Sequence, residues 1–176
     1  MTRPSWDQTW MAIAVNMSKR SKCVNRQVCA VIVTKENRPM AVGYNGPPAN
    51  WNGGVKKAPA KVIHFGTSYI EEEVTNITQC SDFCPRGGSD DRGTSYSNCV
   101  SVHAEANALL FADRRDYEGG TIYVTNPCCW DCAKLVGNSG VARVVVQVSE
   151  VDEHYDNDAS LNFIRSCGIQ VDTISS

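Results

Sequence analysis

CVSVHAEANALL (residues 99–110) and YVTNPCCWDCAK (residues 123–134) are the two stretches that decide the fold and the chemistry of this chain. His103, Cys129 and Cys132 supply three ligands of the kinds that a catalytic zinc takes, which leaves the fourth tetrahedral position for water. Cys129 and Cys132 are spaced i, i+3, so both sulfurs leave one face if Cys129 opens a helix. A helix N-terminus also favours the thiolate form that a metal needs. Zinc lowers the pKa of its water toward about 7, so the two stretches predict a catalytic metal site.

Glu105 follows His103 by two residues. In the middle of a helix that spacing puts two side chains on nearly opposite faces. We therefore expect both residues in the first helical turn, where both reach a site beyond the helix end. A carboxylate there can carry a proton from water to a ring nitrogen and then to leaving ammonia. The pattern H-x-E with P-C-x-x-C marks zinc nucleobase deaminases, in which the glutamate is not a ligand.

The chain resembles the cytidine and deoxycytidylate deaminase superfamily, and within it the dCMP deaminases, including those of phages. The resemblance rests on residues 21–33, residues 43–48 and the two zinc stretches, and it leaves out Asn50 to Asn98. One position departs from the family pattern: Cys128 stands where the family usually has proline, and Pro127 comes one residue earlier. The family spacing fits without a gap if Cys129 and Cys132 are the ligands. Cys128 with Cys132, spaced i, i+4, is the alternative pair.

The resemblance also implies contacts with the substrate. It implies this set of substrate-binding residues: Asn45, Ala104, Phe111, Arg114 and Arg115. In phage relatives the positions of Phe111 and the arginines lie near the nucleotide or a subunit contact. An ordinary turn asparagine at position 45 and solvated arginines are the alternatives. By charge alone, Lys134, Arg114 and Arg115 are candidates for the 5′-phosphate.

The resemblance further implies regulation and assembly. Enzymes of this family are commonly hexamers that dCTP activates and dTTP inhibits, and Mg²⁺ accompanies the effector triphosphate. The implied effector stretch contains Tyr44, Asn45 and Gly46. We therefore expect a homo-oligomer, with a hexamer as the implied state.

Composition sets the outer limits. A chain of 176 residues fits one domain, so we expect a single domain over 1–176 with a long insertion at about 50–98. A net charge of −2 disfavours a nucleic-acid partner. The chain has neither an apolar run of about 20 residues nor a secretory signal, so we expect no membrane association. Nine cysteines without a signal peptide favour reduced thiols over a disulfide scaffold. We expect a cytoplasmic protein, in the host cytoplasm if a phage encodes it.

Alternating periodicities predict an α/β fold. Apolar residues recur at helical spacing and predict a helix to about Ser18, with the tryptophan and methionine stripe in the core: Trp6, Trp10, Ile13, Ala14 and Met17. Apolar, β-branched runs predict the strands, and helical periods the remaining helices. We expect strands over residues 28–34, 40–44, 121–125, 141–148 and 168–174, and helices over 102–114, 129–136 and 156–166. The order predicts a three-layer α-β-α sandwich with a five-stranded mixed sheet, in which both zinc stretches lie where a strand ends and a helix begins. Leu109 and Leu110 are expected in the core.

Residues 50–98 follow no regular period, because glycine and proline recur throughout. A structureless loop of this length would be unusual in a compact domain, so something should organise it. Val62 to Val74 is expected to form one short element. A second, structural zinc is one hypothesis for the region, and free, buried cysteines are the alternative. Its candidate ligands are Cys80, Cys84 and Cys99, with His64 or Cys23.

Three functions compete. The favoured one is hydrolytic deamination of a cytosine nucleotide, dCMP to dUMP, with Glu105 moving protons. A non-catalytic zinc-stabilised module, its site closed by Cys128, has no need for Glu105. A tRNA or single-stranded DNA deaminase would need a basic, aromatic surface, and the run from Glu71 to Glu73 disfavours it. Val144 to Val148 lacks tyrosines that phage relatives carry there, which leaves room for 5-methyl- or 5-hydroxymethyl-dCMP.

Overall fold

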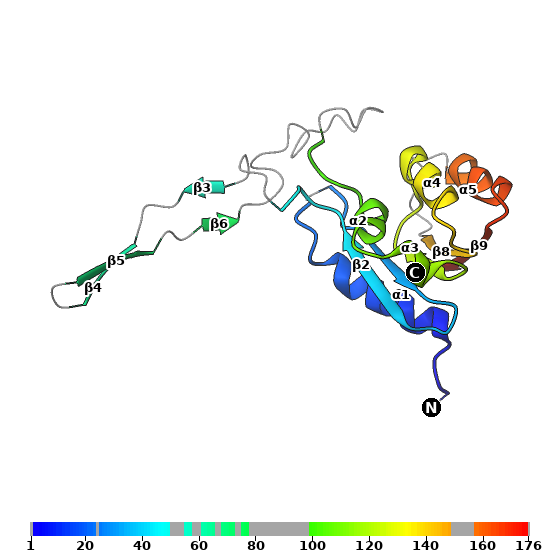
Figure 1. Ribbon diagram of the computed structural model, residues 1–176, viewed down its shortest axis with the longest axis horizontal. Helices are drawn as coiled ribbons and strands as arrows, with labels where there is room; N and C mark the ends of the chain where they lie inside the picture. Colours follow the sequence, from blue (N-terminus) through cyan, green and yellow to red (C-terminus); the bar gives the residue numbers. More distant parts are fainter. Residues whose placement is uncertain are drawn as a thin grey trace.

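A mixed five-stranded sheet forms the centre of the fold (Figure 1). The computed structural model describes residues 2–23, 25–49, 99–148 and 157–175, and the backbone of 55–57, 61–65, 68–72 and 75–77. The strand order is β2-β1-β7-β8-β9, in which β1 is antiparallel to β2 and to β7, and β7, β8 and β9 are parallel. The strands are β1 (Cys29–Val33), β2 (Pro39–Tyr44), β7 (Thr121–Val124), β8 (Arg143–Val148) and β9 (Gln170–Ser175). The predicted five-stranded mixed sheet is confirmed.

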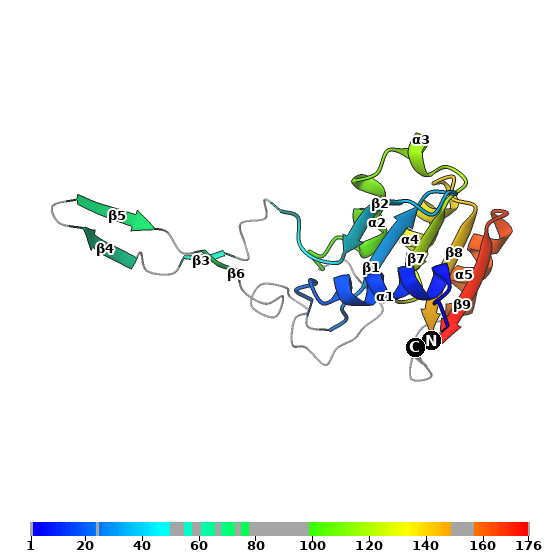
Figure 2. The ribbon, with the colours of Figure 1, turned by 90° about the horizontal axis from the view of Figure 1, so that it is seen from below.

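Helices cover both faces of this sheet (Figure 2). Helix α1 (Trp6–Ser18) packs on one face, and α2 (Ala104–Leu110), α4 (Trp130–Gly137) and α5 (Asn157–Ser166) pack on the other. Strand β1 shows the consequence: Val31 packs toward α1 and Ile32 toward the other helices, and neither is exposed. Burial on both faces explains why the strand sequence is continuously apolar. The three-layer architecture is confirmed.

Helix α1 begins at a capping box in which Ser5 accepts from the Gln8 amide and the Gln8 side chain accepts from the Ser5 amide. Its buried residues include Trp10, Met11 and Ala14. The predicted core stripe of tryptophan and methionine was wrong at Trp6, which is 50% exposed. The helix presents a stripe turned by about one residue, and Trp6 stacks on Trp10 instead of entering the core.

An ion-pair network ties α1 to the sheet on this face. The Arg143 guanidinium donates two hydrogen bonds of 2.8 Å to Asp7 and one of 2.6 Å to Asp172. Tyr123 Oη donates to Asp7 at 2.8 Å. The Arg143 hydrogen bonds hold the pKa of Asp7 below its usual value. The network therefore joins α1, β7, β8 and β9.

The predicted helix over 102–114 is divided in two. Helix α2 ends at Leu110, and a short helix, α3 (Arg114–Tyr117), follows. Phe111 leaves helical geometry with φ −99° and ψ 6°. The expectation that Leu110 lies in the core was wrong, since its side chain is 75% exposed, whereas Leu109 is partly buried against the core.

Two small antiparallel ladders occupy part of the 50–98 region. Strand β3 (Val55–Lys57) pairs with β6 (Thr75–Ile77), and β4 (Lys61–Phe65) pairs with β5 (Ser68–Glu72). The prediction of one short element over 62–74 was wrong, because both KVIHF and SYIEE are rich in β-branched and aromatic residues and pair with each other. The single domain with an insertion stays a prediction. In the described ranges, every helix is too short or too polar to cross a membrane.

Helix α2 lies directly against β2 because Gly43 has no side chain. A Cβ at Gly43 would overlap backbone atoms of Ala104 and Ala108. This close approach sets how deeply the helix seats on the sheet edge. The start of α2, where His103 and Glu105 lie, depends on it.

Replacing Gly43 with alanine is expected to lower the free energy of unfolding by on the order of 3 kcal/mol, because backbone atoms must move to admit the new methyl group. Urea denaturation measures the change. Gly46→Ala is the matched control, since a Cβ there meets nothing within 4 Å. Equal stability of the two variants would contradict this account of how α2 is seated.

Candidate active site

His103 stands at the junction between an extended segment and α2. It is the N-cap of the helix, with φ −70° and ψ 156°, and Glu105 lies in the first turn. Val102, directly before it, pairs with Gly46: Val102 N donates to Gly46 O at 2.8 Å and Gly46 N donates to Val102 O at 3.2 Å. The loop after β2 thus fixes the backbone that carries the imidazole.

Cys129 and Cys132 occupy the corresponding junction before α4. Strand β7 ends at Val124, and Thr125 anchors the following loop to β1: its Oγ1 accepts from Cys29 N, and its N–H donates to Cys29 O, each at 3.0 Å. Cys129 is the N-cap of α4, and its sulfur accepts from Cys132 N at 3.5 Å. The helix that the sequence predicted therefore begins where both thiols face one side.

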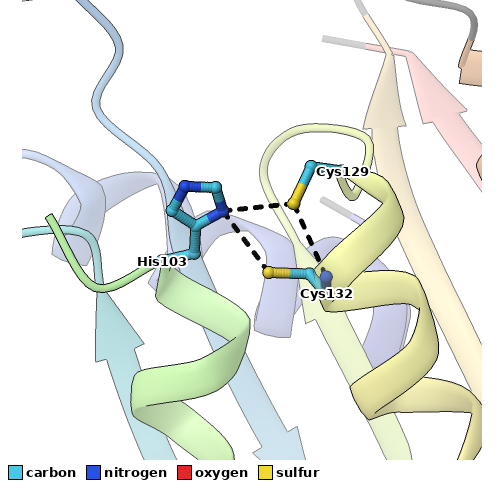
Figure 3. Close-up of side chains that lie close together, drawn as sticks. All are labelled: His103, Cys129 and Cys132. Carbon is cyan, nitrogen blue, oxygen red and sulfur yellow. Dashed lines mark hydrogen bonds between the residues drawn. The ribbon is translucent and has the colours of Figure 1, made fainter. Parts of the chain in front are cut away.

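The three side chains converge (Figure 3). His103 Nδ1 lies 3.3 Å from Cys129 Sγ and 3.4 Å from Cys132 Sγ, and all three ligand atoms lie within 4.8 Å of one another. Tetrahedral zinc with ordinary Zn–N and Zn–S bond lengths separates a nitrogen from a sulfur ligand by about 3.6 Å. The donor set and its spacing therefore fit one zinc ion, with three protein ligands as in catalytic sites.

Hydrogen bonding prepares one sulfur as a thiolate. A hydrogen bond from the Cys132 thiol, with further ones from His103 and the Cys132 amide, lowers the pKa of Cys129 to about 4. The pKa of Cys132 is raised because it keeps the proton that it shares with Cys129. The hydrogen bond with Cys129 likewise raises the pKa of His103. Metal ligands must be deprotonated, so zinc binding releases these protons.

Glu105 is a buried carboxyl group beside this cluster, with only 4% of its surface exposed. Burial raises its pKa, and the His103 charge opposes that shift. A dication at the neighbouring ligands would oppose it further. The group can therefore hold or give up a proton according to what lies next to it.

Cys128 contacts this carboxyl group and does not join the ligand cluster. Its thiol is 2% exposed and shares a hydrogen bond with Glu105. Burial first, and then the Glu105 charge, raise the pKa of Cys128 well above its usual value. Within the described residues, the group of close metal-ligating side chains contains Cys129 and not Cys128.

Asn45 is occupied by backbone contacts. Its Nδ2 donates to Arg26 O at 2.8 Å, its Oδ1 accepts from Val28 N at 2.9 Å, and its carbonyl accepts from Ser21 Oγ at 2.8 Å. The side chain thus holds the segment before β1 against the loop after β2. Its assignment as a substrate contact stays a prediction.

The other predicted substrate residues lie in different surroundings. Ala104 is fully buried between His103 and Glu105, and Phe111 is 79% exposed. Arg114 lies beside Gly140, past the end of α4 that is opposite Cys129. Arg115 pairs with Asp113 at 2.7 Å and Lys134 with Asp131 at 2.9 Å, both on the surface. The assignment of these residues as substrate contacts stays a prediction.

The second zinc site falls largely outside the described residues. The side chains of His64, Cys80 and Cys84 are not described. The side chains of Cys23 and Cys99 are partly buried. The second site therefore stays a prediction.

Sequence reasoning missed Asn107. Its side-chain Nδ2 donates to Tyr44 O at 2.8 Å and joins α2 to the end of β2. One signal was present: Asn107 is the one amide side chain within the otherwise apolar run from Ala106 to Leu110.

Comparisons with known proteins agree with this geometry. The family profile described as the cytidine and deoxycytidylate deaminase zinc-binding region matches residues 4–148. The deoxycytidylate deaminase of Mycobacterium phage D29 is 38% identical over 151 residues, covering 82% of this chain and 96% of that protein. The enzyme of Enterobacteria phage T4 is 34% identical over 177 residues, covering 93% and 86%.

The fold is likewise shared with a solved structure. The dCMP deaminase of cyanophage S-TIM5, crystallised with dCMP and dUMP, superimposes with a TM-score of 0.62 at 20% identity, covering 99% of this chain and 100% of that one. Both the ligand cluster and the glutamate lie within the matched residues 4–148. On these grounds the chain belongs to the cytidine and deoxycytidylate deaminase family.

Proposed function

We propose that this chain is a zinc-dependent deaminase that converts dCMP and water to dUMP and ammonia. The observation that carries the proposal is Glu105: a buried carboxyl group lies in the same helical turn that presents a metal-ligating histidine. A structural zinc site has no use for such a group, whereas hydrolysis needs a proton carrier.

The ligands in this proposal are His103, Cys129 and Cys132. When bound, zinc supplies Lewis acidity, which makes water nucleophilic at neutral pH. The water oxygen forms a bond to C4 while Glu105 takes one water proton and delivers it to N3 of the cytosine ring. Glu105 then carries the second proton, from the new hydroxyl group on C4, to the N4 amino group as the C4–N4 bond breaks and ammonia leaves. Its burial keeps this carboxyl group away from bulk solvent, so the proton is exchanged with substrate instead of water.

The substrate assignment is supported by relatives of similar length that are deoxycytidylate deaminases. Deamination of a tRNA or DNA base and a non-catalytic zinc module are not favoured. Two reduced thiols at the centre of the site suit a reducing compartment such as the cytoplasm. Acceptance of 5-methyl- and 5-hydroxymethyl-dCMP stays a prediction.

Regulation by dCTP and dTTP, with Mg²⁺ accompanying the triphosphate, also stays a prediction for the stretch that contains Tyr44, Asn45 and Gly46. Its support is connectivity: Gly46 pairs with Val102, one residue before His103. A ligand bound at this stretch would therefore touch the backbone that carries a metal ligand.

The wild-type protein loaded with zinc is expected to release ammonia from dCMP and much less from cytidine, CMP and dCTP. Glu105→Gln is expected to lower kcat by on the order of 10³-fold, because the amide cannot accept the water proton. Ammonia release and zinc content are both measured. Glu118→Gln is the control, because it makes the same change to an exposed carboxylate at the end of α3. A Glu105→Gln variant with full activity would overturn the mechanism.

Zinc content separates the two candidate cysteine pairs. Cys129→Ala is expected to lose zinc, whereas Cys128→Ala is expected to retain about one ion per chain, since its thiol contacts Glu105 and not the cluster. Metal analysis after dialysis measures both. The reverse pattern would establish Cys128 with Cys132 as the ligand pair.

We also infer that the chain self-associates through the surface between α2, α3 and α4. An apolar groove of about 290 Å³ opens there, and exposed Leu110 and Leu135 line it beside Ala106, Leu109, Tyr117 and Ser139. Helix α3 at its edge carries both arginines and acids, so a two-fold related copy can place opposite charges against each other.

Leu135→Glu is expected to shift the mass of the particle in solution toward the monomer, because a carboxylate would be buried in the interface. Analytical ultracentrifugation at micromolar concentration measures the mass. Ile13→Glu on α1, a side chain of similar exposure on the opposite face, is the control. A monomeric wild type, or an unchanged mass in Leu135→Glu, would contradict the inferred surface.

A further inference from the structure

Asn107 makes two contacts that the proposed chemistry does not use. Its backbone N–H donates to His103 O at 2.9 Å, and its side-chain Nδ2 donates to Tyr44 O at 2.8 Å. One residue therefore bonds both to the backbone of a proposed metal ligand and to the end of strand β2. It lies two residues after Glu105, in the same short helix.

The Tyr44 carbonyl needs this partner. Asn45 N donates to Val28 O at 3.1 Å, so the N–H of the Tyr44–Asn45 peptide points toward β1. In a trans peptide the C=O points the opposite way, which here is away from β1. Strand β2 is at the edge of the five-stranded sheet, so no neighbouring strand in that sheet can reach this carbonyl. The Asn107 amide fills the gap that the sheet leaves.

Helix α2 cannot set its own orientation. It has seven residues, which is too few to be stable alone, so contacts with the sheet must place it. Gly43 fixes how deeply it seats, and the pairing of Gly46 with Val102 fixes the chain that enters it. The buried Ala104 and Ala108 turn one face of the helix toward the sheet. The side-chain bond from Asn107 adds a directional contact that opposes rotation, because it attaches one edge of the helix to a fixed point on β2.

We propose that Asn107 is a positioning residue that fixes the rotation of α2, and through it the placement of the His103 imidazole and the Glu105 carboxylate. Loss of the bond lets the first turn rotate. His103 Nδ1 then moves from the two sulfurs, and Glu105 moves from the reacting atoms. A displacement of about 1 Å at a catalytic group can lower a rate by up to about 100-fold.

The test compares Asn107→Asp with Tyr123→Phe in the zinc-loaded, full-length protein. Aspartate has the shape of asparagine but cannot donate to the carbonyl, whereas Tyr123→Phe removes a hydrogen bond of equal length, 2.8 Å, on the α1 face of the sheet. Asn107→Asp is expected to lower kcat for dCMP by about ten-fold or more while KM changes by less than about three-fold. Asn107→Asp is also expected to lose zinc to a competing chelator several times faster than the wild type does. Tyr123→Phe is expected to lower Tm without either change.

The kinetic measurement rests on the proposed deaminase function, whereas the measurement of zinc loss to a chelator does not. If the wild type does not act on dCMP, zinc release still tests whether Asn107 places His103. If Asn107→Asp does not fold, Asn107→Ala replaces it, since alanine removes the donor without adding a charge. The positioning role would be overturned if, for the same loss of Tm, the Asn107 and Tyr123 variants showed the same changes in zinc release and in kcat.

Discussion

The two halves of the active site are held together by the start of strand β1. The ligand atoms come from positions 26 and 29 residues apart in the sequence, on helices that begin at separate loops. Val28 accepts from Asn45 N on one side of β1, and Cys29 exchanges hydrogen bonds with Thr125 on the other. Asn45 leads through Gly46 to His103, and Thr125 leads to Cys129. The tolerance of a metal site, about ±0.2 Å, is met because both loops are bonded to adjacent residues, Val28 and Cys29, where the buried strand β1 begins.

Convergence of two helix starts also governs the electrostatics. The N-termini of α2 and α4 both face the cluster, and each carries partial positive charge. That charge favours the Cys129 thiolate and partly offsets the burial of Glu105. The same low-dielectric surroundings raise the pKa of any acid that lacks a specific partner. Two thiolates and a carboxylate repel one another at this separation, so a bound cation would stabilise the site by balancing their charge.

Local sequence patterns predicted the sheet, the order of elements and the convergence of His103, Cys129 and Cys132, because each depends on spacing within a helix start or a strand. Features that depend on packing between distant segments were not predicted. The exposure of Leu110 follows from where α2 ends, and helical period alone does not set that end. Asn107 is the one amide side chain in an apolar run, but its role could not be assigned from the sequence, because its partner is a backbone carbonyl at the end of an edge strand.

Cys128 stands where the resemblance in the sequence led us to expect proline, and the surroundings of its thiol decide its role. Proline would restrict the loop before α4, and here Pro127 supplies that restriction one residue earlier. The thiol that replaces it is buried against Glu105, and both facts raise its pKa. Cys129, which accepts hydrogen bonds at a helix N-terminus, has its pKa lowered to about 4. Because Cys128 contacts Glu105 and lies outside the group formed by His103, Cys129 and Cys132, the geometry favours Cys129 as the ligand and leaves Cys128 beside the proton carrier.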